Sequence, residues 1–115
     1  MTTTNMPPIR LAVAAALAFV MGAMVAVQAA TTLTIQQKGL MLSRSSATIA
    51  KGDRLVFTNE DDVIHNIHIF GPSDFEKDLG LQKPHAALSY VFDKPGQYRV
   101  RCNIHPSVKM SVTVN

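Results

Sequence analysis

From residue 30 onward, apolar and polar residues alternate in short runs. Alternation with a period of two is typical of half-buried β-strands, because successive side chains of a strand point to opposite faces of the sheet. Lys51-Gly52-Asp53 and Lys94-Pro95-Gly96 interrupt the alternation and predict turns. The pattern predicts seven short strands, over Thr32–Gln36, Ala47–Ala50, Arg54–Thr58, His65–Phe70, Ser89–Phe92, Gln97–Cys102 and Met110–Val114.

Seven short strands within residues 30–115 favour an all-β fold, a two-sheet sandwich with Greek-key connections. The segment Gly71–Ala87 contains Pro72, Gly80 and Pro84, and we expect it to be one long connection with a short helical turn around Asp74–Leu79. We expect no second domain, because a chain of this length supports only one small core.

The first 29 residues follow a different pattern. Arg10 precedes an apolar stretch, Leu11–Val27, and Val27-Gln28-Ala29 then supplies the small residues that a signal peptidase requires. We therefore expect residues 1–29 to be a signal peptide cleaved after Ala29, which leaves residues 30–115 as an exported, periplasmic domain without a membrane span. An uncleaved membrane anchor is the alternative, because the run approaches the roughly 18 apolar residues at which a spanning helix becomes plausible.

The charge balance is mild, with 11 Lys and Arg against 8 Asp and Glu. The basic residues are spread along the chain, and no recognition helix or aromatic stacking platform is evident, so we expect no nucleic-acid partner. Metalloprotease, phosphate-loop and serine-hydrolase motifs are missing. Cys102 and His105 resemble a thiol nucleophile and its base, but a chain this small gives no sign of a substrate cleft. The sequence therefore does not predict an enzyme.

Cys102 is the only cysteine, so the chain cannot close an internal disulfide in the oxidising compartment where exported proteins fold. A dimer bridge, a buried inert thiol and a metal thiolate remain. A cysteine, two histidines and a weak, long methionine contact form the ligand set of a blue-copper electron-transfer centre. His105 follows Cys102 closely, and Met110 comes next. Alternation points Cys102 and Met110 inward at the same end of the sandwich, with His105 on the loop between them.

Several motifs, in their order and spacing, resemble the cupredoxins, in particular the plastocyanin, pseudoazurin and amicyanin group of small blue-copper proteins. These motifs are Lys51-Gly52-Asp53, Phe57-Thr58-Asn59, His65-Asn66, Pro95-Gly96-Gln97-Tyr98, and Cys102 with His105. The resemblance implies that one copper ion is bound by His65, Cys102, His105 and Met110.

The same resemblance shows which of the two upstream histidines is expected to be the ligand. In that family the ligand histidine is followed directly by asparagine, which selects His65 over His68. His68 lies on the opposite face of the predicted strand, so we expect a surface or partly buried residue there. His85 is expected to face solvent. The resemblance also implies that Asn66 forms a hydrogen bond to the loop that carries Cys102 and fixes both segments.

Two alignments with the resembled family disagree about the axial ligand. Counted forward from His105, Met110 has the spacing found in plastocyanin and pseudoazurin. Counted back from Val112-Thr113-Val114, the ligand methionine of plastocyanin and amicyanin corresponds to Val108, which cannot coordinate a metal. Both positions share the inward face, so alternation does not choose between them. We predict that Met110 is the ligand, and a three-coordinate copper beneath Val108 is the alternative.

The resemblance implies an exported, monomeric carrier that passes single electrons between redox protein partners. These would dock transiently at the His105 end, on an apolar patch formed by Pro106 and Val108, with Pro72 a weaker candidate. A copper chaperone or buffering module with the same ligands is the alternative. A metal-free or zinc-holding structural domain is a third reading, because Cys and His also bind Zn²⁺.

Arg99 and Arg101 form an outward basic pair on the cysteine strand, which we interpret as a solvated face. Arg101 stands where plastocyanins tend to carry a tyrosine, so the electron path through this flank of plastocyanin does not transfer to this chain.

Overall fold

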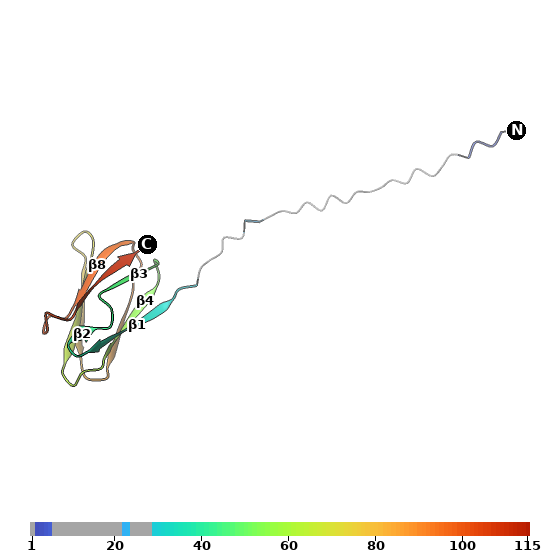
Figure 1. The fold of residues 1–115 in the computed structure, drawn as a ribbon. Coiled ribbons are helices and arrows are strands. Elements are labelled where there is room, and N and C mark those ends of the chain that lie inside the picture. Colours follow the sequence, from blue (N-terminus) through green and yellow to red (C-terminus); the bar gives the residue numbers. More distant parts are fainter. Residues whose placement is uncertain (1, 6–21, 24–28) are drawn as a thin grey trace.

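The computed structural model describes residues 2–5, 22–23 and 29–115, so most of the predicted signal peptide lies outside the described residues. Within the described residues, the secondary structure consists of nine strands (Figure 1). They are β1 Thr32–Lys38, β2 Met41–Leu42, β3 Ser46–Ile49, β4 Arg54–Asn59, β5 His65–Phe70, β6 Glu76–Gln82, β7 Ala87–Val91, β8 Gly96–Arg101 and β9 Lys109–Val114. In this described part of the chain, no helix is long and apolar enough to span a membrane.

The strands form two sheets, one of four strands in the order β2-β1-β4-β7 and one of five in the order β3-β9-β8-β5-β6. Strands distant in the sequence are neighbours in both sheets, including the parallel pairs β1/β4 and β3/β9. The chain therefore crosses between the sheets repeatedly, as Greek-key connections require. This all-β, two-sheet sandwich is the predicted fold class, which is confirmed.

The expectation for the segment Gly71–Ala87 is wrong, because it contains the strand β6 instead of a long connection with a helical turn. β6 pairs antiparallel with β5 at one edge of the five-stranded sheet, with a register shift between Ile67 and His68. Most side chains of β6 are exposed, so its sequence shows no apolar alternation. The strand β6 is held by backbone hydrogen bonds to β5. The order of apolar and polar residues in the sequence gives no information about such backbone pairing. The two-residue strand β2 is missed for the same reason.

The core lies between the inner faces of the two sheets. Alternation holds along β8, where Tyr98 and Val100 are buried while Arg99 and Arg101 are exposed, and Cys102 continues the buried row directly after the strand ends. The predicted inward row of β9 is also confirmed. Its members are Met110, Val112 and Val114. The residues at the ends of these rows are thus placed by rigid sheets, and the loop between β8 and β9 projects from the end of the sandwich away from the C-terminus (Figure 1).

Aromatic rings fill the sandwich toward the other end. Phe92 packs edge to face against Tyr98, with ring centroids 5.1 Å apart, and against Tyr90 at 4.9 Å. Phe75 joins them at 6.1 Å from both tyrosines. The Tyr98 ring leaves no room for a side chain at Gly71, where a Cβ atom would lie 2.6 Å from Tyr98 Cε1. We call Phe75, Tyr90, Phe92 and Tyr98 the aromatic cluster.

Candidate metal centre

Three potential metal ligands meet at one end of the sandwich. His65 opens β5, Cys102 follows β8, and His105 lies in the loop that leads to β9. Cys102 Sγ lies 3.8 Å from His65 Nδ1 and 3.9 Å from His105 Nδ1, and the two Nδ1 atoms are 3.1 Å apart. His65 and Cys102 are buried, while His105 is half-buried. The structure thus brings together His65, Cys102 and His105, which the sequence selects as candidate ligands.

The dimensions of this triangle fit a single metal ion. A divalent ion such as Zn²⁺ binds a histidine nitrogen at about 2.0–2.1 Å and a cysteine sulfur at about 2.3 Å, and three such bonds span donor separations of this size. An imidazole nitrogen that carries no proton has a lone pair that can bind a metal ion, so both Nδ1 atoms can serve as ligands. The donor set of one thiolate and two imidazoles is the one that blue-copper sites use.

An acidic residue that sequence reasoning missed, Asp61, contacts the ring nitrogen of His65 that faces away from the other two donors. Asp61 Oδ2 lies 2.8 Å from His65 Nε2, and the same carboxylate accepts hydrogen bonds from the backbone N–H groups of Gly39 at 2.6 Å and Leu40 at 3.1 Å. When Nδ1 faces the metal, Nε2 carries the proton and donates a hydrogen bond to Asp61. This hydrogen bond fixes the tautomer and the orientation of the ring. Glu60-Asp61-Asp62 reads as a solvated acidic run, so the sequence offers no signal for this role.

The carboxylate of Asp61 stays ionised over a wide pH range. Burial by itself would raise the pKa of Asp61, but hydrogen bonds from the His65 ring and from the Leu40 and Gly39 amides outweigh it. The pKa therefore lies below its usual value of 3.8. An anion beside the imidazole holds the ring in one orientation, with Nδ1 toward the other donors.

Asn66 links the two segments that carry the ligands, as the resemblance implies. Its backbone N–H donates to Cys102 Sγ at 3.3 Å, and its side-chain Oδ1 accepts a hydrogen bond from the backbone N–H of Asn103 at 3.1 Å. Its Nδ2 donates to Asp78 at 2.7 Å, which holds the amide in position. The predicted connection is confirmed, and it fixes the cysteine loop against β5.

The two remaining histidines lie apart from the cluster. His68 is nearly buried on the outer face of β5, stacked on Phe70 with ring centroids 4.2 Å apart, as the partly buried prediction allows. Its Nδ1 lies 2.8 Å from Asn103 Nδ2, and its Nε2 lies 2.7 Å from a Glu76 carboxylate oxygen. His68 thus steadies the cysteine loop from outside. His85 is exposed in the turn before β7, as expected.

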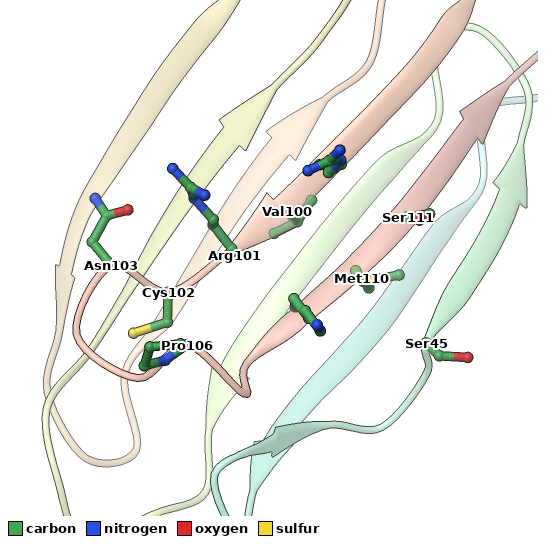
Figure 2. A pocket seen from close by; sticks show the side chains of 10 residues that line it. Ser45, Val100, Arg101, Cys102, Asn103, Pro106, Met110 and Ser111 are labelled. Atoms are coloured by element: carbon green, nitrogen blue, oxygen red, sulfur yellow. The ribbon is translucent and has the colours of Figure 1, made fainter.

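The β8–β9 register distinguishes Val108 from Met110, the two candidate positions for the axial ligand. Met110 pairs with Val100, whereas the backbone N–H of Cys102 donates to the carbonyl of Val108 at 2.9 Å. Figure 2 shows Met110 farther along β9 than the loop that holds Cys102 and Pro106. Coordination by Met110 stays a prediction. The expectation that Val108 contributes to an exposed docking patch is wrong, because its side chain is 0% exposed in the core.

Comparison with known proteins identifies relatives across the described sandwich. The family model of copper-binding proteins, plastocyanin/azurin family, matches residues 29–115. Amicyanin-alpha of Methylorubrum extorquens is 29% identical over 107 residues, which is 90% of this chain and 90% of that protein. Methylamine utilization protein MauL of the same species is 32% identical over 63 residues, and MauL of Methylophilus methylotrophus is 29% identical over 66 residues. The chain spans only 38% to 55% of the length of these MauL proteins.

Solved structures of amicyanin share the fold. The Cu(I) form of a methionine-to-alanine mutant of amicyanin superimposes with a TM-score of 0.67 at 20% identity, covering 73% of this chain and 82% of that one. A reduced tryptophan-to-tyrosine mutant of amicyanin gives a TM-score of 0.67 at 20% identity, over 76% of this chain and 86% of that one.

Proposed function

Because the chain belongs to the plastocyanin/azurin family of copper-binding proteins, we propose that it is an exported type 1 copper protein that carries single electrons between redox partners. The observation that supports this most directly is the triangle of His65 Nδ1, Cys102 Sγ and His105 Nδ1. In this proposal these three side chains hold the ion. Bound copper supplies the one-electron chemistry by alternating between Cu(I) and Cu(II).

The chain's own contribution is to keep the ligands in one arrangement in both oxidation states. Asp61 fixes the His65 ring, and Asn66 ties β5 to the cysteine loop. Both ligand segments leave the ends of sheet strands, which are more rigid than free loops. Since the donor atoms already lie in position, electron transfer requires little rearrangement of the protein.

His105 is the only half-buried residue of the three donors, and its near neighbour in the loop, Ile104, is an exposed apolar residue. Six large apolar residues are exposed among the described residues, and all belong to segments that carry or contact the ligands. They are Leu40, Met41, Val63, Ile64, Leu81 and Ile104, which we call the apolar end face. Ser107 Oγ donates to the Leu40 carbonyl at 2.8 Å, so the β1–β2 turn packs against the loop of His105.

An apolar face around the electron exit suits a transient redox partner. Exposed apolar patches mark interaction sites, and a small contact allows the fast dissociation that a carrier needs. Pro106, an expected member of the docking patch, is exposed. In this proposal the exposed Ile104 replaces the buried Val108 as an apolar member of that patch. The docking site of the proposal is therefore the apolar end face.

The export and the redox chain are parts of the same proposal. The apolar stretch before Ala29 supports export to the periplasm. Two relatives are named methylamine utilization proteins, so an amine-oxidising chain is the first place to look for the electron donor.

The experiment is voltammetry of the copper-loaded protein combined with a Cu(I)-chelator challenge. A carrier gives a reversible one-electron wave and loses copper slowly to the chelator, because its ligands are preorganised and mostly buried. A chaperone or buffering module transfers Cu(I) to the chelator quickly and gives no stable wave. That second result would replace the carrier with the alternative function.

The docking site is tested by electron self-exchange between the oxidised and reduced protein, which requires no known partner. Ile104→Glu should slow self-exchange several-fold, because it places like charges where two apolar end faces meet. Arg101→Glu, on the basic flank, should change it little, and Lys51→Glu at the far end controls for the change in net charge. Copper content and reduction potential verify that the site is intact. A larger effect of Arg101→Glu would move the exit to the basic flank.

A further inference from the structure

We infer that the metal site has no axial ligand, because Val108 occupies the inward position beside Cys102 and Met110 belongs to the core beneath it. This inference rests on the proposed function and deepens it. It concerns the residue that sets the reduction potential, which in blue-copper sites is tuned by the axial ligand and by the apolar surroundings of the cysteine sulfur.

The backbone register places Val108 at the site. Arg101 pairs with Lys109 in the last residue pair of the β8–β9 ladder, so the next pair is Cys102 with Val108. The hydrogen bond from Cys102 N–H to the Val108 carbonyl, at 2.9 Å, confirms this continuation. Side chains of directly opposed residues have Cβ atoms about 4.5–5.5 Å apart. Val108 is therefore the cross-strand neighbour of the thiolate.

A second hydrogen bond ties Val108 to the other ligand on the loop. The backbone N–H of Val108 donates to the carbonyl of His105 at 3.0 Å, which closes the loop between the histidine and β9. Both polar backbone groups of Val108 are thus committed to ligand residues. Its side chain is 0% exposed and belongs to the same buried cluster as Cys102. Because both backbone groups are hydrogen-bonded and the side chain is fully buried, the side chain of Val108 points inward, toward the core.

Met110 lies one step deeper in the same inward row. It pairs with Val100, and two residues along a strand correspond to about 6.8 Å, so its backbone is that much farther from the ligand end than Val108. Met110 is 4% exposed and is packed among the core residues. Val108, directly before β9, lies along the chain between Met110 and the ligand His105. A thioether that reached the site from Met110 would have to pass a fully buried neighbour.

The consequence is a three-ligand site capped by an alkyl group. Valine donates no electron pair, so nothing at this position favours the more highly charged Cu(II) state. Its side chain also excludes water from the axial position. The reduction potential should therefore be higher than that of the same site with a thioether beneath it.

Substitutions at Met110 in β9 and at Val108, the residue directly before β9, test the inference. Met110→Leu should leave the reduction potential and the visible and electron paramagnetic resonance spectra of the copper-loaded protein unchanged, because it exchanges one core side chain for another of similar volume. Val108→Met should lower the potential and change both spectra, because it places a thioether beside the thiolate. Val108→Leu is the matched control, since it adds volume without a donor atom.

The possible outcomes separate this inference from the proposed function. A raised potential or altered spectra in Met110→Leu would overturn the inference and make Met110 the axial ligand, even if Val108→Met fails to fold. A parent protein that takes up copper without an intense visible band would overturn the type 1 assignment itself, and the inference with it. A normal band with an unchanged Met110→Leu spectrum supports both.

Discussion

The two ends of the sandwich are built on different principles. At the ligand end, buried polar groups form a connected set: Asp61 holds His65, and Asn66 holds the loop of Cys102. Toward the other end, about 14 Å away along the strand from Cys102 back to Tyr98, the aromatic cluster fills the space with rings. The ligand end has its geometry set by directional hydrogen bonds, whereas the aromatic end is stabilised mainly by packing.

This difference suggests a division of labour. Buried polar networks hold one arrangement of ligands, but they add little net stability because each hydrogen bond replaces one to water. Large buried aromatic side chains contribute strongly to stability through the apolar area that they bury, and those of the aromatic cluster are not metal ligands. We therefore expect substitutions at the ligand end to change the spectrum and metal affinity, and substitutions at the aromatic end to change the free energy of unfolding.

The largest effect is expected for Cys102→Ser at the ligand end. The variant should lose the intense visible band completely, because Cys102 is the only thiol in the chain. The fold should survive, since serine is smaller and the hydroxyl can accept the Asn66 N–H that Cys102 Sγ accepts now. Visible absorption and far-ultraviolet circular dichroism measure the two properties. A blue Ser variant would contradict the assignment of the thiolate.

The converse change is Phe92→Ala in the aromatic cluster. Phe92 is 0% exposed and contacts two rings, so its truncation should cost about 3–5 kcal/mol in the free energy of unfolding. The spectrum of the folded, copper-loaded variant should match that of the parent. Chemical denaturation and visible absorption measure both. A changed spectrum would show that the two ends are coupled, contrary to the division of labour.

A smaller effect is expected for Asn66→Ala, which removes the side-chain bridge to Asn103. The cysteine loop loses its attachment to β5, so copper affinity should fall by about 10- to 100-fold, the usual cost of losing a residue that orients metal ligands. Competition with a copper chelator measures the affinity. Equal affinity in the Ala variant and the parent would make the bridge dispensable.

The smallest effect is expected for Asp53, in the turn before β4. Hydrogen bonds from the backbone N–H groups of Thr31 and Ala50 to its carboxylate lower its pKa below the usual 3.8. A lowered pKa in the folded state means that the stabilisation is present above about pH 4 and is lost as the pH falls through the folded value. Asp53→Asn should therefore flatten the loss of stability below pH 4.

The same variant leaves the ligand end untouched, so its visible spectrum at neutral pH should match the parent. Stability measured by denaturation at several pH values between 3 and 7 tests the prediction. An unchanged slope below pH 4 would show that Asp53 does not contribute to the acid sensitivity of the fold.

The sequence predicts the two-sheet architecture and the three clustered donors because both depend on local signals. Alternation along β8 places Cys102 at the end of a buried row, and the resemblance to the cupredoxins, through the His65-Asn66 motif, selects one histidine. The strand β6 escapes prediction because an exposed edge strand needs no apolar pattern. Asp61 escapes because its role depends on the β1–β2 turn, which reaches it only in the folded chain.

The place of Val108 opposite Cys102 is the other feature that sequence reasoning cannot supply. Positions 108 and 110 share one inward face, and alternation gives no information on which of them lies opposite Cys102. Only the register of β8 against β9 resolves the two, through the Val100–Met110 pair. Register depends on contacts between strands that the pattern of one strand does not contain.

The most direct test of copper binding by the three clustered donors is a titration of the metal-free protein with Cu(II), followed by visible absorption. We predict an intense thiolate-to-copper band that grows linearly and stops at one copper per chain, because His65, Cys102 and His105 form a single site of matched size. Copper uptake without that band, or a site that binds only Zn²⁺ tightly, would contradict the assignment of a type 1 copper site.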